Sequence, residues 1–167
     1  MSTAGGYYPP VGFHFKVEFS GIGNDNDSRF QSVSGLTVEY EVETVKEGGE
    51  NRFEHKLPVR TRYPDLILKR GLLVDSGVVA WLLDGLQNRQ FTPAQVTISL
   101  LNEAHEPLMT WKVYNAWPKK WTVSDFNSQE NGIVIETLEL CYSYFSTQLI
   151  DANMIQQGVS AAVSFLS

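Results

Sequence analysis

The chain has 167 residues, 43% of them apolar, and a formal net charge of −6. This length is typical of one domain with a single core, because a chain of this size buries about 70% of the surface that it exposes when unfolded. The acidic balance and the scattered basic residues exclude a surface built to hold nucleic-acid phosphates, which requires clustered lysine and arginine. Cys141 is the single cysteine, so an internal disulfide is excluded.

Residues 1–11 are small and aromatic with two prolines, and they predict a flexible N-terminal arm. They contain neither the basic segment nor the apolar stretch of a signal peptide. The sequence has no run of about 18 apolar residues, which a membrane-spanning helix requires. We therefore expect no membrane anchor, and synthesis and assembly in the cytoplasm.

Residues 12–20 predict the first strand, because apolar and polar side chains alternate along them. The next eight residues, GIGNDNDS at 21–28, combine the residue types that favour turns and predict a surface loop. Residues 24–27 resemble a calcium loop in composition only, because the later glutamate of such loops is missing.

Residues 36–59 predict an extended hairpin arm with an exposed tip. Apolar residues occupy every second position of 36–42. Three glutamates take the alternate positions: Glu39, Glu41 and Glu43. Residues 46–51 (KEGGEN) predict the turn, and a second alternation starts at Phe53, where Pro58 removes one ladder hydrogen bond. Unpaired strand edges recruit other chains, so we expect another subunit to cover this arm.

Residues 66–70 (LILKR) predict a short strand that Gly71 ends. The helical period then appears at residues 76–88, with Ser76 as the N-cap and an apolar face along one side. That face comprises Val78, Val79, Leu82, Leu83 and Leu86. We expect the helix to lie against the sheet as a lid, with Trp81 near the edge of its apolar face.

The remaining chain predicts four more strands and a C-terminal extension. The strands lie at residues 96–100, 108–116, 121–126 and 133–144. Many strands with one helix, and turns about every ten residues, favour an all-β barrel or sandwich. The predicted organisation is an N-terminal arm at 1–11, a mainly β domain at 12–145 and an extension at 146–167.

Five short motifs in a fixed order carry a family resemblance. They are FQSVSGL at 30–36, VEYE at 38–41, EGGEN at 47–51, LP at 57–58 and LILKRGL at 66–72. With these motifs the chain resembles the inner tube proteins of contractile-tail phages and of bacterial contractile injection systems, over roughly residues 9–144. The resemblance implies a small β-barrel subunit that assembles into hexameric rings, which stack into a hollow tube inside a contractile sheath. Tube subunits of this family commonly end near the last strand, so the extension leaves open a bulk tube subunit or a tube initiator at one end.

No residue set predicts catalysis, a metal site or a cofactor. Cys141 lies within a predicted strand, where a thiol is usually a small packing residue, and the sequence has no nucleophile elbow. His14, His55 and His105 lack the spacing of metal ligands. The glycine pair at 48–49 lacks the lysine and the serine or threonine that follow in a phosphate-binding loop. An enzyme is therefore the least favoured class.

Three tryptophans support an alternative function. Trp111, Trp117 and Trp121 are close enough in sequence to form a sugar-binding platform, although tryptophans in small β-proteins more often pack between sheets. The alternative is thus a monomeric β-sandwich module, one that binds glycans.

The favoured function is a structural subunit of the inner tube of a contractile tail or injection system, one that conducts cargo or DNA. Its expected partners are copies of itself, neighbouring rings, sheath and baseplate or spike proteins, and cargo in the lumen, without sequence-specific nucleic-acid binding. The resemblance places it in a phage virion, or in an injection particle that is released or anchored in the envelope. The residues predicted to form ring-stacking contacts are Lys46, Glu47, Gly48, Gly49, Glu50, Asn51 and Arg52. Glu39, Glu41 and Glu43 are predicted to face the lumen, where an acidic stripe repels polyanions, since side chains alternate between the two faces of a wall strand.

Overall fold

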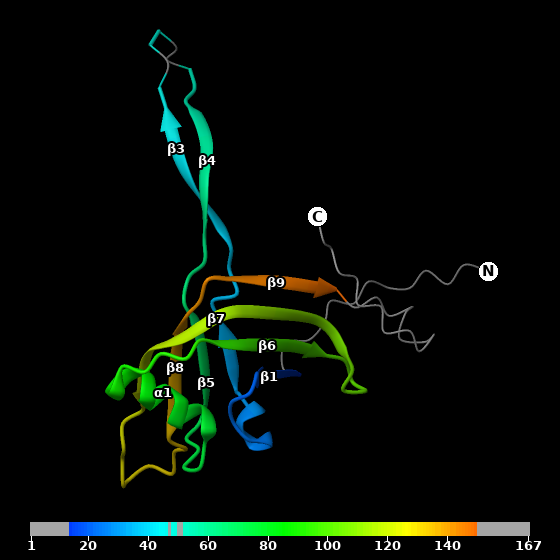
Figure 1. Ribbon diagram of the computed structural model, residues 1–167, viewed down its shortest axis with the longest axis vertical. Helices are drawn as coiled ribbons and strands as arrows, with labels where there is room; N and C mark the ends of the chain where they lie inside the picture. Colours follow the sequence, from blue (N-terminus) through cyan, green and yellow to red (C-terminus); the bar gives the residue numbers. More distant parts are fainter. Residues whose placement is uncertain (1–13, 47, 50–51, 150–167) are drawn as a thin grey trace, which may run out of the picture.

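The computed structural model describes residues 14–46, 48–49 and 52–149, and strands dominate it. Figure 1 shows a β-sheet body that carries one α-helix and a two-stranded arm projecting from it. The predicted mainly β fold, with one packed helix and an extended hairpin, is therefore confirmed. The predicted N-terminal arm, residues 1–11, lies outside the described residues.

The elements follow one another in this order: β1 (Phe15–Phe19), the 3-10 helix η1 (Asp25–Ser28), β2 (Ser32–Ser34), β3 (Glu39–Val45), β4 (His55–Arg62), β5 (Leu66–Gly71), α1 (Gly77–Asn88), β6 (Ala94–Leu101), β7 (Pro107–Val123), β8 (Ile135–Cys141) and β9 (Tyr144–Leu149). The body is an antiparallel sheet of seven strands in the order β1-β6-β7-β8-β5-β2, and β9 also pairs with β7. Strands β3 and β4 form the separate two-stranded sheet of the arm.

Strand β7 is longer than predicted and joins the two halves of the body. Its first part pairs with β6 on one side and β9 on the other, and its last part pairs with β8. The sequence predicts two strands, at 108–116 and 121–126, separated at Trp117 and Pro118; this break was wrong. Pro118 lies at a register shift of the β7–β8 ladder, and a bulge accepts a residue that has no N–H to donate.

The last predicted strand, residues 133–144, is instead two strands. Strand β8 ends at Cys141, and β9 starts at Tyr144 on the same side of β7. The interruption lies opposite Asn115, whose φ of 55° is left-handed and takes β7 out of regular pairing. Strand β9 runs across the boundary predicted between the β domain, residues 12–145, and the C-terminal extension, residues 146–167. Residues 150–167 of the extension lie outside the described residues.

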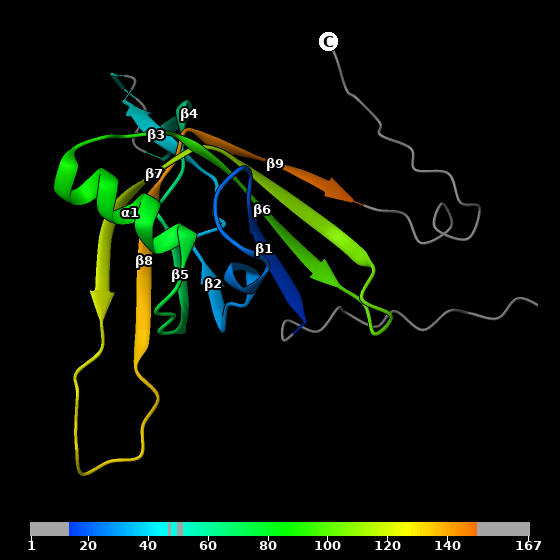
Figure 2. The ribbon, with the colours of Figure 1, turned by 60° about the horizontal axis from the view of Figure 1, so that its bottom comes forward.

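The core lies between the sheet and α1, which Figure 2 shows against the β7 side of the body. Its fully buried members include Val17, Leu66, Leu68, Val78, Leu82, Val96, Val113, Leu138 and Leu140. Burying one such side chain contributes about 1.5 to 3 kcal/mol. The alternating burial of β5, β6 and β8 confirms their one-sided strand pattern.

Helix α1 starts as predicted, because the Oγ of Ser76 accepts a hydrogen bond from the backbone N–H of Val79 at 3.1 Å. The predicted apolar face is partly wrong. Leu86 is 37% exposed, whereas Trp81 is buried. A Cβ on Gly85 would lie 2.5 Å from a ring carbon of Pro118, so α1 packs tightly against β7 at Gly85. No α-helix within the described part of the chain is long and apolar enough to span a bilayer.

Candidate assembly surface

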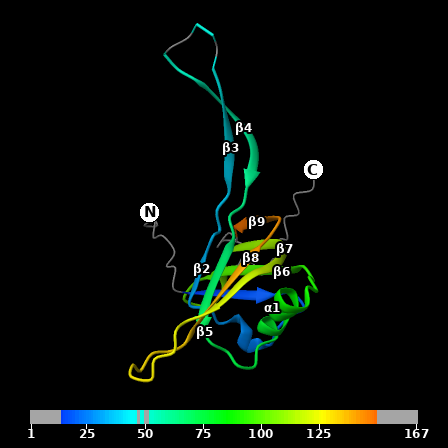
Figure 3. The same ribbon diagram turned by 90° about the vertical axis from the view of Figure 1, so that its left-hand side faces the viewer.

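The arm formed by β3 and β4 stands clear of the body (Figures 1 and 3). The two strands contact each other, and neither makes more than sparse contacts with any other element. All residues of β4 and all but one of β3 are exposed. A two-stranded hairpin alone is at best marginally stable in water, so the arm requires a partner that covers it.

Arginines of β4 lie beside the three glutamates that the sequence predicts to face a lumen. Glu41 forms an ion pair with the Nε of Arg60, and an oxygen of Glu39 lies 3.8 Å from the Nε of Arg62. The carboxylate of Glu41, as a hydrogen-bond acceptor, raises the pKa of Arg60. Glu43 has no ion pair with any described residue. This face therefore presents mixed charge instead of an unbroken acidic stripe.

A β-bulge mixes apolar and charged residues on both faces of the arm. The register shifts after Glu41, so that Val42 pairs with Pro58 and Val59 remains outside the ladder. Proline is tolerated at such a position because the bulge does not require its missing N–H. The shift places Leu57 opposite Glu43.

The arm also exposes seven large apolar side chains, each between 40% and 65% exposed. They are Val38, Tyr40, Val42, Val45, Phe53, Leu57 and Val59. So many exposed apolar side chains on one element are typical of an interaction site, because leaving them in water forgoes the free energy of burial.

The tip of the arm contains the residues predicted to form ring-stacking contacts. Lys46 lies 3.3 Å from a carboxylate oxygen of Glu54, across the hairpin. Gly48 and Gly49 occupy the turn, and the φ of 105° at Gly49 requires a residue without a side chain. Glu47, Glu50 and Asn51 lie outside the described residues, so the stacking role of this group stays a prediction.

The root of the arm is held by a close backbone approach and by aromatic contacts. Gly35 has a φ of 93°, and a Cβ there would lie 2.0 Å from the carbonyl oxygen of Asp65. The hydroxyl of Tyr142 donates a hydrogen bond to the carbonyl of Gly35 at 3.2 Å. Tyr63 packs edge-on against Tyr142 and Phe145, with ring centroids 5.9 and 5.4 Å away. These contacts anchor the base of an otherwise unsupported hairpin.

Asp65 also connects the arm root to the body. The ammonium of Lys119 lowers the pKa of Asp65, mainly through a hydrogen bond. The thiol of Cys141 donates to Asp65 Oδ1 at 3.3 Å. Burial and the neighbouring Asp65 carboxylate raise the pKa of Cys141 to about 11. A half-buried thiol with this pKa is neutral at pH 7 and is a poor nucleophile.

A buried ionic network lies where β5, β8, η1 and α1 meet. The Nε of Arg70 pairs with Glu136, its Nη1 lies 3.0 Å from Asp27 Oδ1, and its Nη2 donates to Ser76 Oγ at 2.7 Å. The indole N–H of Trp121 donates to the second oxygen of Glu136 at 3.1 Å. The two carboxylates and the guanidinium are almost fully buried, so their charges are compensated mainly within this network.

Asp27 joins this network to the start of the helix. Its Oδ2 accepts hydrogen bonds from the backbone N–H groups of Asn24 at 2.7 Å and of Gly77 at 3.1 Å. Burial alone raises the pKa of Asp27, but the hydrogen bonds from Ser76, Asn24 and Arg70 outweigh it, and the pKa lies below its usual value. A carboxylate at a helix N-terminus is also stabilised by the helix dipole.

Sequence reasoning missed this network, although it contains a signal. Arg70 continues the buried alternation of Leu66 and Leu68, and Glu136 does the same for Leu138 and Leu140. Opposite charges at the buried positions of two strands indicate an internal ion pair, since a buried charge requires a partner.

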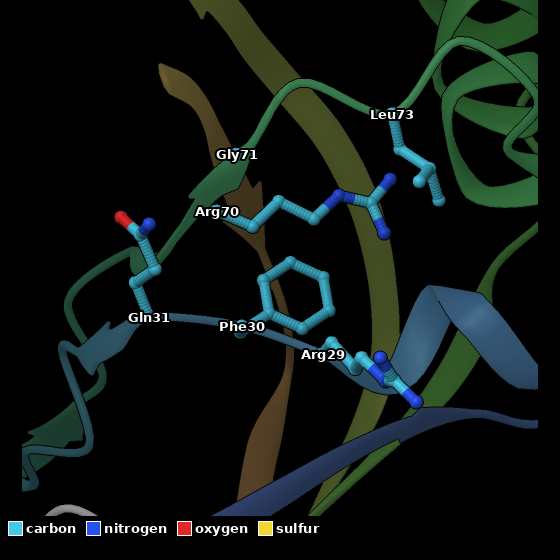
Figure 4. Close-up of a pocket in the computed structure, with 6 residues that line it drawn as sticks. All are labelled: Arg29, Phe30, Gln31, Arg70, Gly71 and Leu73. Carbon is cyan, nitrogen blue, oxygen red and sulfur yellow. The ribbon is translucent and has the colours of Figure 1, made fainter. Parts of the chain in front are cut away.

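A cavity of about 350 Å³ lies beside the network and is shown in Figure 4. Its walls are Arg29, Phe30, Gln31, Arg70, Gly71 and Leu73. The guanidinium of Arg70 lies over the ring of Phe30, 4.9 Å from its centroid. Arg29 is exposed at the rim and has no ion pair with any described residue.

The structure brings two of the three histidines together and leaves the third apart. His14 and His105 lie edge to face with ring centroids 4.5 Å apart, whereas His55 lies on the arm. Among the described residues, no three His, Cys, Asp or Glu side chains are grouped as metal ligands.

The three tryptophans of β7 do not form one platform. Trp111 and Trp121 pack against the core, whereas Trp117 is 40% exposed and lies against Phe91. The alternative of a glycan-binding module is therefore not favoured.

The seven-stranded sheet extends a hairpin with exposed apolar side chains into solvent. This arrangement is typical of one class of protein, the subunit of a larger assembly. Residues 11–146 match the T4-like virus tail tube protein gp19 family, and the chain belongs to this family. The predicted resemblance to the tube proteins of contractile tails and injection systems is thus confirmed.

Solved structures with the same fold include chains from contractile injection particles. A chain of the anti-feeding prophage baseplate, solved with six-fold symmetry, is 32% identical with a TM-score of 0.78, covering 87% of this chain and 99% of that chain. A chain of the PVC extracellular contractile injection system, from its sheath–tube complex, is 29% identical with a TM-score of 0.72, covering 86% and 93%. A type six secretion system protein shares the fold at 13% identity, with a TM-score of 0.57 over 84% and 87% of the two chains. The curated protein sequences contain no match.

Proposed function

We propose that this protein is a structural subunit of the inner tube of a contractile injection system or phage tail, and that six copies close into a ring. The exposed apolar arm carries this proposal, because it is a surface that only an assembly covers. The family and the six-fold symmetry of the anti-feeding prophage structure support it. The role is mechanical: the protein conducts cargo or DNA and catalyses no reaction.

Free strand edges supply the lateral contact in this proposal. Within the described residues, β1, β2 and β9 each pair with a single strand. A head-to-tail contact between different edges of neighbouring copies generates a closed ring when the rotation fits. Each backbone hydrogen bond across such an edge contributes about 0.5 to 1.5 kcal/mol.

The partners of the tube follow from the particles in which the similar chains were solved. A sheath–tube complex and a sheath/tube terminator both contain such a chain. We therefore propose that this subunit contacts sheath and terminator proteins, as well as baseplate or spike proteins. Assembly in the cytoplasm, followed by release or anchoring of the particle, belongs to the same proposal.

The lumen-facing position of Glu39, Glu41 and Glu43 remains part of the proposal in an altered form. Because Arg60 and Arg62 lie beside Glu41 and Glu39, the net negative charge of this row of side chains is smaller than the sequence predicts. Cysteines at positions 39 and 43, in a Cys141→Ser background, should react with a small maleimide but not with a bulky one once tubes are assembled. Equal reaction with both reagents would place these residues on the outside.

Removing the arm tests the proposed function. Gly35 and Asp65 are adjacent in space, so Asn-Gly can replace residues 38–62 and leave β2 and β5 paired. This variant should fold and stop at monomers or single rings, while the full chain forms stacked rings and tubes in light scattering and negative-stain images. A full chain that stays monomeric at every concentration would contradict the proposal.

A further inference from the structure

The loop between β7 and β8, residues 124–134, projects from the body of the molecule (Figure 2). It contains the single Asn-Gly pair of the sequence, Asn131-Gly132, and both residues are exposed. Asn-Gly is typical of two-residue hairpin turns of type I′, in which both central residues have positive φ. The residues with positive φ in the described part of the chain include neither Asn131 nor Gly132. The pair is therefore not held in such a turn.

The side chain of Asn131 makes no hydrogen bond with any described residue, and the backbone N–H of Gly132 makes none either. A Cβ on Gly132 would have nothing within 4 Å. Glycine also allows more backbone conformations than any other residue. The side chain of Asn131 can therefore fold back onto the nitrogen that follows it, without breaking a hydrogen bond.

Other asparagines of the described chain are held by hydrogen bonds. In the same loop, Oδ1 of Asn127 accepts one from the backbone N–H of Gln129 at 3.0 Å. Oδ1 of Asn102 accepts two from backbone N–H groups of the β6–β7 turn, both at 2.9 Å. Nδ2 of Asn88 donates to Asp84 at 2.9 Å. None of these three asparagines precedes a glycine.

We propose that Asn131 is a site of spontaneous deamidation, at which the asparagine converts to aspartate and isoaspartate without an enzyme. The backbone nitrogen of Gly132 attacks Cγ of Asn131, and the new N–Cγ bond closes a succinimide ring. The Cγ–Nδ2 bond breaks, and the amide leaves as ammonia with the proton of the attacking nitrogen. Water then opens the ring. Attack of water at Cγ yields aspartate, and attack at the main-chain carbonyl carbon of Asn131 yields isoaspartate.

Both products change the loop. Each adds one negative charge to a chain with a formal net charge of −6. The new carboxylate joins Asp125 and Glu130 in the same loop, close to Ile133, which is 76% exposed. In isoaspartate the main chain runs through Cβ and Cγ, so the backbone of the loop gains a methylene group. The inference goes beyond the proposed function, because the reaction requires neither a ring nor a tube.

Peptide mapping of the full chain during incubation at pH 8 measures the conversion. Cleavage after glutamate releases residues 131–136, in which Asn131 is the single asparagine, and residues 107–130, which contain Asn127. The first peptide should gain about 1 Da and separate into two isomers by chromatography. Asn127 should convert about tenfold more slowly, because its hydrogen bond to Gln129 has to break first. An unchanged mass at residues 131–136, or equal rates at the two asparagines, would overturn the inference.

Gly132→Ala tests the attacking nitrogen. The added methyl group restricts the backbone beside this nitrogen, so the rate of conversion should fall about tenfold. The thermal unfolding midpoint should stay that of the parent, because the new methyl group meets no other atom. A folded variant that converts as fast as the parent would contradict attack by the nitrogen of residue 132.

Ser128→Gly separates the effect of the structure from that of the dipeptide. It creates a second Asn-Gly pair in the same loop, at an asparagine that Gln129 holds. In the folded variant Asn127 should still convert more slowly than Asn131, and in urea the two rates should become similar because the hydrogen bond is lost. Equal rates in the folded variant, or the same difference in urea, would show that the free side chain of Asn131 has no role.

These measurements do not depend on assembly. A chain that stays monomeric but converts at Asn131 would overturn the proposed function and leave this inference intact. A chain that forms tubes but never converts would do the opposite.

Discussion

The side chain of Arg70, on β5, contacts residues of three other parts of the fold. Its guanidinium holds Glu136 of β8, Asp27 of η1 and the helix cap Ser76 together beneath α1. A buried ion pair adds little net stability compared with apolar packing, but removing one partner leaves buried charge uncompensated. The network therefore specifies how the helix, η1 and the sheet fit together.

We expect Arg70→Met to lower the free energy of unfolding by about 3 to 5 kcal/mol, because both carboxylates lose their cation. Urea denaturation followed by tryptophan fluorescence measures it. Lys16→Met is the matched control, since Lys16 pairs with Glu18 at 2.6 Å in solvent and its removal should cost less than about 1 kcal/mol. Equal losses in the two variants would contradict the role of the network.

Cys141 should react slowly with iodoacetamide. Its pKa of about 11, against an ordinary value of 9.0, reduces the thiolate fraction at pH 8 about a hundredfold. Alkylation of the folded protein at pH 8 should lag behind that of the urea-unfolded chain by at least this factor. Asp65→Asn should accelerate the reaction, because it removes the carboxylate that raises the pKa. A thiol that labels as fast in the folded state would contradict this assignment.

The arm is the element in which sequence pattern and structure agree in outline and differ in detail. Alternation predicted two long strands and an exposed turn, and β3 and β4 confirm them. The β-bulge beside Pro58 and the pairing of Glu39 and Glu41 with arginines depend on register. A one-residue shift of register changes which side chains share a face, and no local pattern determines it.

Gly35 at the arm root should tolerate no side chain. A Cβ would lie 2.0 Å from a backbone oxygen, and the φ of 93° strains any other residue. We expect Gly35→Ala to cost about 1 to 3 kcal/mol from backbone strain alone, with the close contact adding to it. Gly132→Ala is the control, because nothing lies within 4 Å of its Cβ, and it should stay within about 0.5 kcal/mol of the parent. Thermal unfolding compares them, and equal midpoints would refute the close approach.

At the scale of the whole molecule, the acidic groups determine how stability changes with pH. The pKa of Asp27 and that of Asp65 lie below the ordinary value of 3.8 in the folded state. A group with a depressed pKa stabilises the fold above its unfolded pKa and loses this contribution as the pH falls through its folded pKa.

The free energy of unfolding should therefore lose the contribution of these two groups as the pH falls below about 3.8. In Asp27→Asn this dependence should be weaker, because the variant keeps an acceptor for Ser76 but has no charge to titrate. Urea midpoints between pH 7 and pH 3 measure the difference. A variant with the pH dependence of the parent would show that Asp27 does not carry it.

The sequence by itself determined the fold class, the helix with its Ser76 cap, the arm and the family, because alternation, capping residues and short ordered motifs are local properties. Only the tertiary structure decided the continuity of β7 through Pro118, the buried Arg70 network and the contacts at Gly35. These features depend on which distant residues meet, as Arg70 meets Asp27 and Glu136 across three elements. These long-range contacts depend on strand register and on packing over the whole chain. A short stretch of sequence carries no information about either.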